Sequence, residues 1–167
     1  MYDHERLQLF GAAEGIGLGL VNHVVEDRAG NIWAATDGGF SQIRRRHFRA
    51  LTPRRSLPRQ AVYDAAEDDE GAWWLLMENR LLRFPPGEID RALADSTRAI
   101  AYRQFDALDG LPGTLGGNAF QGSQITRAAD GRIWVATDTA GASIDPRKLP
   151  VGAGPFGADR SRSQRRP

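Results

Sequence analysis

A basic cluster in the first third of the chain, Arg44-Arg45-Arg46-His47-Phe48-Arg49, is the clearest candidate for binding chemistry. Guanidinium groups bind carboxylates and phosphates through paired hydrogen bonds, so this cluster could hold an anionic ligand. Because alternate side chains of a strand point to opposite faces, only every second member can share one surface. Arg45 and Arg49 are the candidates on such a surface. A solvated face of an outer strand explains the same residues without a ligand, and nucleic acid is not an expected partner.

The remaining residue types form no catalytic or metal-binding pattern. Glu67-Asp68-Asp69-Glu70 supplies carboxylates, but it lacks the alternate spacing of a calcium loop and is expected to be a solvated turn. The three histidines are scattered along the sequence. Gly15-Ile16-Gly17-Leu18-Gly19 lacks the Lys-Ser/Thr pair of a phosphate loop. We therefore expect no catalytic residue, no metal ion and no cofactor, and we expect that the chain is not an enzyme by itself.

The elements that must position these side chains follow from a phrase that occurs three times, at residues 26–33, 67–74 and 127–134. Each copy contains an acidic residue, a glycine, two further residues and a tryptophan. Such a recurrence indicates one supersecondary unit used repeatedly, and the first interval has about the length of a propeller blade. The residues of this structural repeat are Asp27, Gly30, Trp33, Asp68, Gly71, Trp74, Asp130, Gly131 and Trp134.

Each phrase is typical of a β-hairpin that is followed by further strands. In the first unit, residues 24–27 and 32–36 flank a glycine turn, and residues 40–44 and 47–51 alternate apolar and polar side chains. The second unit repeats this order and adds a short helical excursion near residues 88–95, where good helix formers gather. The sequence thus predicts an all-β fold, a partial β-propeller of about three four-stranded blades at about residues 7–52, 57–105 and 106–149.

The repeated tryptophans have a structural and a functional interpretation. Trp33, Trp74 and Trp134 are expected to be core side chains packed between blades, because repeat units bury a shared hydrophobic residue against their neighbours. A platform for stacking sugars is the alternative. Three blades are fewer than the four to eight of a typical closed propeller, so we also expect exposed apolar terminal faces and self-association.

The composition excludes several classes of protein. Hydrophobic residues make up 41% and charged residues 26% of the chain, as in ordinary soluble domains, and the net charge is +1. No apolar run predicts a membrane contact, and the charged residues 3–6 are not typical of a signal peptide. Cysteine is absent, which excludes disulfides and thiolate metal sites. Residues 150–167 lack periodicity and are predicted to be a disordered Arg-rich tail.

Taken together, residues 7–149 resemble the two-component regulator propeller repeat family. The resemblance is carried by the three hairpin phrases, by the Ala-Thr-Asp that follows two of them, by Asp109-Gly110-Leu111-Pro112 and by Ile144-Asp145-Pro146-Arg147. It implies a non-catalytic, ligand-sensing segment of a sensor whose partners are further blades and an output domain such as a histidine kinase. The implied ligand is a carbohydrate or other small molecule, and the implied location is a periplasmic sensor region. The turns at Met77-Glu78-Asn79 and Thr139-Ala140-Gly141 depart from the family pattern.

Two other functions stay open at this stage. Streptogramin-lyase-like propellers also repeat an Asp-Gly-x-x-Trp hairpin, but they use a metal with a histidine base, and no histidine here follows the repeat. A plain protein-interaction module is the other alternative. We interpret the chain as the last three blades of a longer sensor, with a truncated or out-of-frame end.

Overall fold

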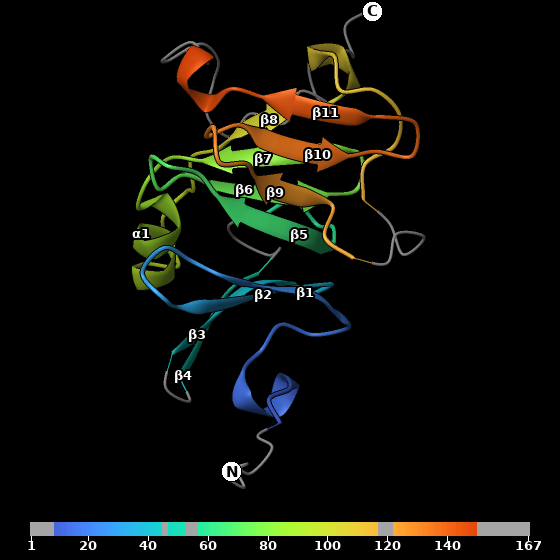
Figure 1. Cartoon of the computed structure of the whole chain (residues 1–167). Coiled ribbons are helices and arrows are strands. Elements are labelled where there is room, and N and C mark those ends of the chain that lie inside the picture. Colours follow the sequence, from blue (N-terminus) through green and yellow to red (C-terminus); the bar gives the residue numbers. More distant parts are fainter. Residues whose placement is uncertain (1–8, 45–46, 53–56, 117–121, 150–167) are drawn as a thin grey trace, which may run out of the picture.

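The structure is a computed structural model that describes residues 9–44, 47–52, 57–116 and 122–149. Within these residues the chain forms three antiparallel sheets, one helix and short 3₁₀ turns, and the sheets follow one another in sequence order (Figure 1). The all-β prediction is therefore confirmed. The predicted tail, residues 150–167, lies outside the described residues. In the described part of the chain, no helix has the length and apolar character needed to cross a membrane.

The first sheet is a four-stranded meander in which each strand pairs with the next. Its strands are β1 (Val21–Glu26), β2 (Ile32–Thr36), β3 (Gly39–Arg44) and β4 (His47–Leu51). The predicted hairpin is confirmed, because Val25 lies opposite Trp33 and Glu26 lies opposite Ile32. Its turn contains Gly30 at a φ of 79°, which is a left-handed conformation that glycine adopts without steric cost.

The second sheet repeats this meander and includes the predicted helix between its last two strands. The elements are β5 (Val62–Glu67), β6 (Trp73–Met77), β7 (Arg80–Phe84), α1 (Glu88–Ala94) and β8 (Arg103–Phe105). Pro85 and Pro86 end β7, since proline has no N–H for the ladder. Helix α1 then packs Ile89 and Ala92 into the core between the first two sheets.

The third sheet has three strands in the described residues instead of the four expected. These are β9 (Ile125–Arg127), β10 (Ile133–Ala136) and β11 (Gly141–Ile144), in the order β11-β10-β9. After β11 the chain turns into a 3₁₀ helix, η3 (Pro146–Lys148), because the Asp145 side chain accepts the Arg147 N–H and Pro146 fixes the first helical φ. The sheets of the described residues do not close into a ring, and β11 remains an edge strand.

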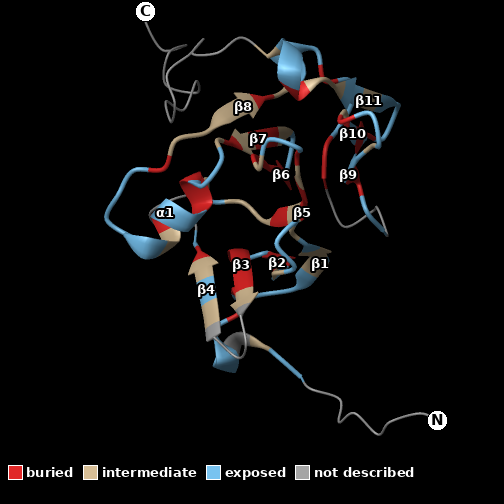
Figure 2. Ribbon diagram, turned by 60° about the vertical axis from the view of Figure 1, so that its left-hand side comes forward, coloured by how far each residue is buried: buried red, intermediate tan, exposed pale blue. Residues whose placement is uncertain are grey.

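The core lies in two layers, one on each side of the second sheet. All residues of β6 are buried, as expected for a strand with another sheet on each face. Trp73, Leu75 and Met77 belong to the layer shared with the first sheet, whereas Trp74 and Leu76 belong to the layer shared with the third. Figure 2 shows that the buried parts of the ribbon gather where the sheets face one another. Strand β5 contacts both β1 and β9, so the first strands of the three sheets lie side by side.

Candidate functional site

Two of the three hairpins hold their tryptophan with an aspartate. Asp27 Oδ2 accepts a hydrogen bond from Trp33 Nε1 at 2.8 Å, while Oδ1 accepts from two backbone N–H groups of the turn. Asp68 does the same with Trp74 Nε1 at 2.9 Å and with two turn N–H groups. One carboxylate thus fixes both the turn and the indole. We call this arrangement the aspartate clamp.

The clamp also affects the ionisation of Asp27. Burial opposes the charged form of this carboxylate, but hydrogen bonds from the indole of Trp33 and from the side chain and backbone of Asn31 favour it more strongly. The net result is a lowered pKa for Asp27. The charge of this clamp is therefore maintained by its own hydrogen-bond donors.

The third hairpin has no aspartate clamp, and its tryptophan is not a core residue. Ala128 stands where the first two copies have the aspartate, and the Asp130 carboxylate accepts the backbone N–H of Arg132 at 3.1 Å instead. Trp134 is 45% exposed, whereas the other two repeat tryptophans are at most 1% exposed. The prediction of a core role is confirmed for those two and is wrong for Trp134. Asp130 is likewise not the structural counterpart of the other two aspartates.

In all three sheets the repeat tryptophan lies on the same face, which is the face directed toward the position of the next sheet in sequence order. Trp33 packs on the following sheet, where its ring centroid lies 5.0 Å from that of Trp73. Trp74 packs in the second core layer with Ile133 of the third sheet. Trp134 lies on the opposite face of β10 from Ile133, so in the described residues no further sheet covers it.

A cleft of about 460 Å³ lies between the second and third sheets, at the edges formed by β8 and β11. This volume falls in the range of small-molecule sites, about 300–1,000 Å³. The cleft combines three cationic side chains with an aromatic ring, a hydroxyl and apolar side chains. Its lining residues are Arg103, Phe105, Asp109, Gly110, Leu111, Arg132, Ala142, Ser143, Ile144, Asp145, Lys148 and Leu149.

Arg103 is the cation of the cleft with the most open hydrogen-bonding capacity. Its guanidinium carbon lies 4.8 Å from the centroid of the Phe105 ring, a cation–π contact that leaves the N–H groups available. Among the described residues Arg103 forms no ion pair. Asp109 on the same rim is engaged by its own turn, since its carboxylate accepts the Asp106 N–H at 3.2 Å. This side of the cleft therefore offers donors to a ligand.

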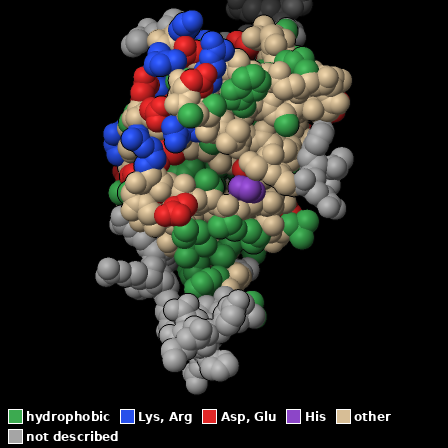
Figure 3. Space-filling model, in the orientation of Figure 1, with side chains coloured by type: hydrophobic (Ala, Val, Ile, Leu, Met, Phe, Trp, Pro, Cys, Tyr) green, Lys and Arg blue, Asp and Glu red, His purple; other side chains and the backbone are tan. Residues whose placement is uncertain are grey.

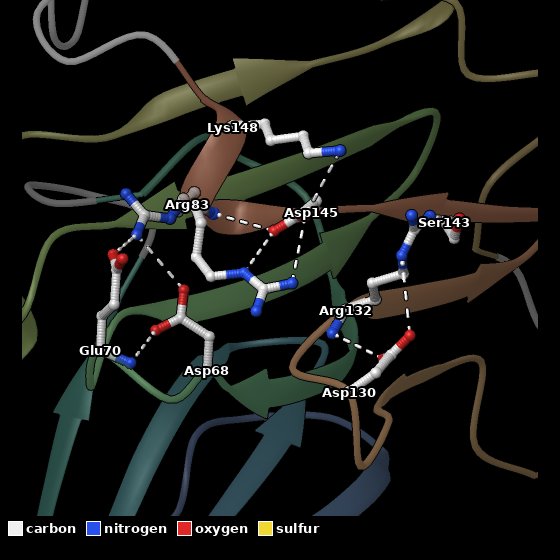
Figure 4. A network of polar contacts seen from close by, with 9 residues as sticks. Asp68, Glu70, Arg83, Asp130, Arg132, Ser143, Asp145 and Lys148 are labelled. Carbon is white, nitrogen blue, oxygen red and sulfur yellow. Dashed lines mark hydrogen bonds and ion pairs between the residues drawn. The ribbon is translucent and has the colours of Figure 1, made fainter.

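The opposite side of the cleft is a short polar network (Figure 4). The Arg132 guanidinium donates to Ser143 Oγ at 3.2 Å, while Asp145 pairs with Arg147 at 2.8 Å and with Lys148 at 4.0 Å. The side-chain hydrogen bond from Arg147 is the main cause of the lowered pKa of Asp145. Asp145 is thus neutralised by two cations of η3. The cleft therefore has hydrogen-bond donors left for a ligand that supplies acceptors. Figure 3 shows positive and negative side chains interspersed over this part of the surface.

Arg83 joins the aspartate clamp of the second hairpin to the surface. Its Nη2 lies 2.8 Å from a Glu70 carboxylate oxygen and 3.3 Å from Asp68 Oδ2, and its guanidinium lies 5.6 Å from the centre of the Trp74 ring. Figure 4 shows Arg83 directed toward both acids. These acids of the predicted solvated turn therefore have different roles, because Asp68 is buried and structural while Glu70 is exposed.

The structure describes only one of the two predicted anion-binding arginines. Arg45 lies outside the described residues. Arg49 is exposed on β4, and its Nη2 donates to the Leu93 carbonyl of α1 at 2.7 Å. It thereby ties the first sheet to the helix of the second unit. Arg49 does not line the cleft between β8 and β11.

A buried aspartate on β5, which the sequence interpretation missed, links the inner strands of all three sheets. Asp64 Oδ2 accepts hydrogen bonds from Ser123 Oγ and from the backbone N–H groups of Gln124 and Ile125. His23 Nε2 of β1 lies 3.5 Å from Asp64 Oδ1. The signal was an acidic residue inside the apolar strand, because a buried carboxylate requires several donors.

The described residues contain no group of three or more His, Cys, Asp and Glu side chains arranged to hold a metal ion. No family model matches this sequence, and no curated protein matches it. The cleft between β8 and β11 is therefore assigned from its own geometry and charge.

Proposed function

We propose that this chain is a ligand-sensing β-propeller segment of a two-component signal transduction sensor and is non-catalytic by itself. The observation that carries the ligand-binding part is the cleft between β8 and β11, where Arg103 presents open donors. The propeller part is supported by three consecutive meanders whose first strands lie side by side. In the first two meanders the repeat tryptophan, Trp33 or Trp74, packs on the next sheet. The signalling part is supported by the family resemblance of the repeat.

The cleft favours a small anionic ligand such as a sugar acid. Arg103, Arg132 and Lys148 line the cleft, and Arg132 and Lys148 already pair with Asp130 and Asp145. Arg103 forms no ion pair among the described residues, so it is the cation that a ligand carboxylate would neutralise. A carboxylate fits an arginine fork, and the Phe105 ring offers an apolar surface beside it. A neutral sugar would leave the guanidinium of Arg103 without a charged partner.

The position of the cleft provides a route from binding to signalling. Arg103 belongs to the second sheet, whereas Arg132 and Lys148 belong to the third unit. A ligand that contacts both units favours the arrangements in which they lie close together, and this differential affinity shifts the population. The sensing event would be a change in the packing of the last two units.

A thermal unfolding series with ligands tests the binding proposal. We expect a uronic acid to raise the unfolding temperature of the full chain and the matching neutral hexose to leave it unchanged. Arg103→Gln should abolish this rise, whereas Arg59→Gln, at an exposed position in the link between β4 and β5, should retain it. Equal responses to acid and hexose, or an intact response in Arg103→Gln, would contradict the assignment of the cleft.

The signalling part has a separate test. Sequencing of the locus beyond codon 150 in all reading frames should show a coding region for a histidine kinase or another phosphorelay output. A locus that codes for no such domain would remove the phosphorelay from the proposal and leave the ligand test unaffected.

A further inference from the structure

Two segments at different places in the chain have a similar local sequence and the same local structure. Phe10 precedes Gly15 by five residues, as Phe105 precedes Gly110. Between each pair lies a 3₁₀ turn, η1 (Ala12–Glu14) or η2 (Ala107–Asp109), and the two glycines have φ values of 98° and 91°. The segment that begins at Phe10 is therefore the counterpart of the segment that begins at Phe105.

The two phenylalanines differ in what surrounds them. Phe105 ends β8, the fourth strand of the second sheet, and its ring stacks on the repeat tryptophan Trp74 with centroids 5.5 Å apart. Phe10 belongs to no sheet of the described residues and is 37% exposed. Its ring contacts Phe48 at 5.4 Å. Residues 9–10 thus resemble the fourth strand of a sheet, but in the described residues there is no three-stranded sheet beside them for this strand to complete.

The third sheet lacks the element that residues 9–10 resemble. Its edge strand β11 has no fourth strand beside it in the described residues. In the first two sheets Phe40 and Leu81 stand next to the repeat tryptophan, but the third sheet has Gly141 at this position. Trp134 is consequently exposed on one side of β10, next to an open strand edge.

The first sheet has a matching apolar face on the side away from the second. Val24 and Ile32 occupy the register positions that Ala65 and Trp73 occupy in the second sheet. Ala65 and Trp73 are buried in the layer that receives Trp33, whereas Val24 and Ile32 are exposed. Figure 3 shows a patch of hydrophobic side chains over the lower part of the molecule, where the first sheet lies.

We propose that a second copy of this chain occupies the open edge of the third sheet. Residues 9–10 of one copy pair with β11 of the other, Phe10 stacks on Trp134, and Trp134 packs against the Val24–Ile32 face. This contact repeats the one that already joins consecutive sheets within the chain. Each copy offers both halves, so two copies satisfy both ends. Two copies supply six sheets, within the four to eight of closed propellers. The closure of two copies into one ring depends on the propeller fold proposed above. The contact between the copies depends only on the equivalence of the Phe10 and Phe105 segments.

Light scattering after size exclusion measures the predicted assembly directly. The full chain should have twice the mass of one 18.3 kDa copy. Phe10→Asp and Trp134→Asp should each give monomers with an unchanged far-ultraviolet circular dichroism spectrum. Leu108→Asp, at an apolar residue that is 79% exposed and outside both surfaces, should remain dimeric. Hydrogen exchange of residues 141–144 should be slower in the wild type than in Phe10→Asp.

Mixing the two monomeric variants tests the direction of the contact. Phe10→Asp retains an intact Trp134 surface and Trp134→Asp retains an intact Phe10 segment, so their mixture should form a heterodimer through one contact. A symmetric tryptophan-to-tryptophan contact would leave Phe10→Asp dimeric and would overturn the proposal. A monomeric wild type, or a continuous distribution of larger species, would overturn it as well.

Discussion

Replacing Asp68 with alanine should cost about 3 kcal/mol of unfolding free energy, because this residue is the buried acceptor of the second aspartate clamp. The substitution leaves the N–H of Ala72 and the indole N–H of Trp74 without their acceptor, and both groups are buried. Each buried unsatisfied donor costs roughly 1–3 kcal/mol. Glu70 is an exposed residue whose N–H bond to Asp68 is only partly buried, so this N–H can bind water instead. Arg83 keeps its pair with Glu70, so neither group adds much to the cost.

The neighbouring Asp69 provides a matched control within the same turn. Its side chain is exposed and pairs with Arg127 at 3.0 Å, and such surface pairs contribute at most about 1 kcal/mol. Urea unfolding of both variants at one protein concentration, followed by circular dichroism, should place Asp68→Ala about 2 kcal/mol or more below Asp69→Ala. Equal free energies for the two variants would show that the clamp does not stabilise the hairpin.

Three further outcomes follow from the same contacts. Ala128→Asp should supply the third hairpin with the missing clamp, raise the unfolding free energy by about 1 kcal/mol and reduce acrylamide quenching of Trp134. Because the pKa of Asp27 is lowered in the folded chain, its contribution to stability is present above its unfolded value and is lost as pH falls through the folded value. Asp27→Asn should therefore flatten the acid limb of a stability–pH curve below about pH 4, and an unchanged limb would contradict the lowered pKa. Glu88→Gln removes a buried charge that accepts the Ala101 N–H at 2.9 Å, so trypsin should cleave the loop after α1 faster than in the wild type.

Local sequence patterns predicted the hairpins and the helix. The exposure of each tryptophan side chain, in contrast, depends on the neighbouring sheets. The glycine turns and apolar strands located all three hairpins, and proline and helix-forming residues located α1. The exposure of Trp134 depends on the absence of a fourth strand and of a following sheet in the described residues, which the phrase around it does not encode. One local signal was available, since Ala128 cannot accept a hydrogen bond from an indole.

The candidate site could not be predicted from the sequence for a different reason. Arg103, Arg132 and Lys148 are separated along the chain and belong to no motif, and they meet only because β8 and β11 lie at facing edges. The arginine run near Arg45 attracted the prediction because its members are adjacent in sequence. Adjacent residues on a strand diverge, and distant ones converge, so charge density along a sequence is a poor guide to charge density in space.

The helix between β7 and β8 has a consequence for engineering. Helix α1 and the buried Ile100 anchor both ends of an excursion whose residues 95–99 are exposed, and β8 then resumes the ladder with β7 in register. The entropy of closing a loop rises only slowly with its length, so an inserted domain at this position adds little to the cost of folding. A fluorescent reporter grafted into residues 95–99 would therefore sit at the outer edge of the second sheet, away from β11 and from the cleft, and could follow ligand binding without occupying either surface.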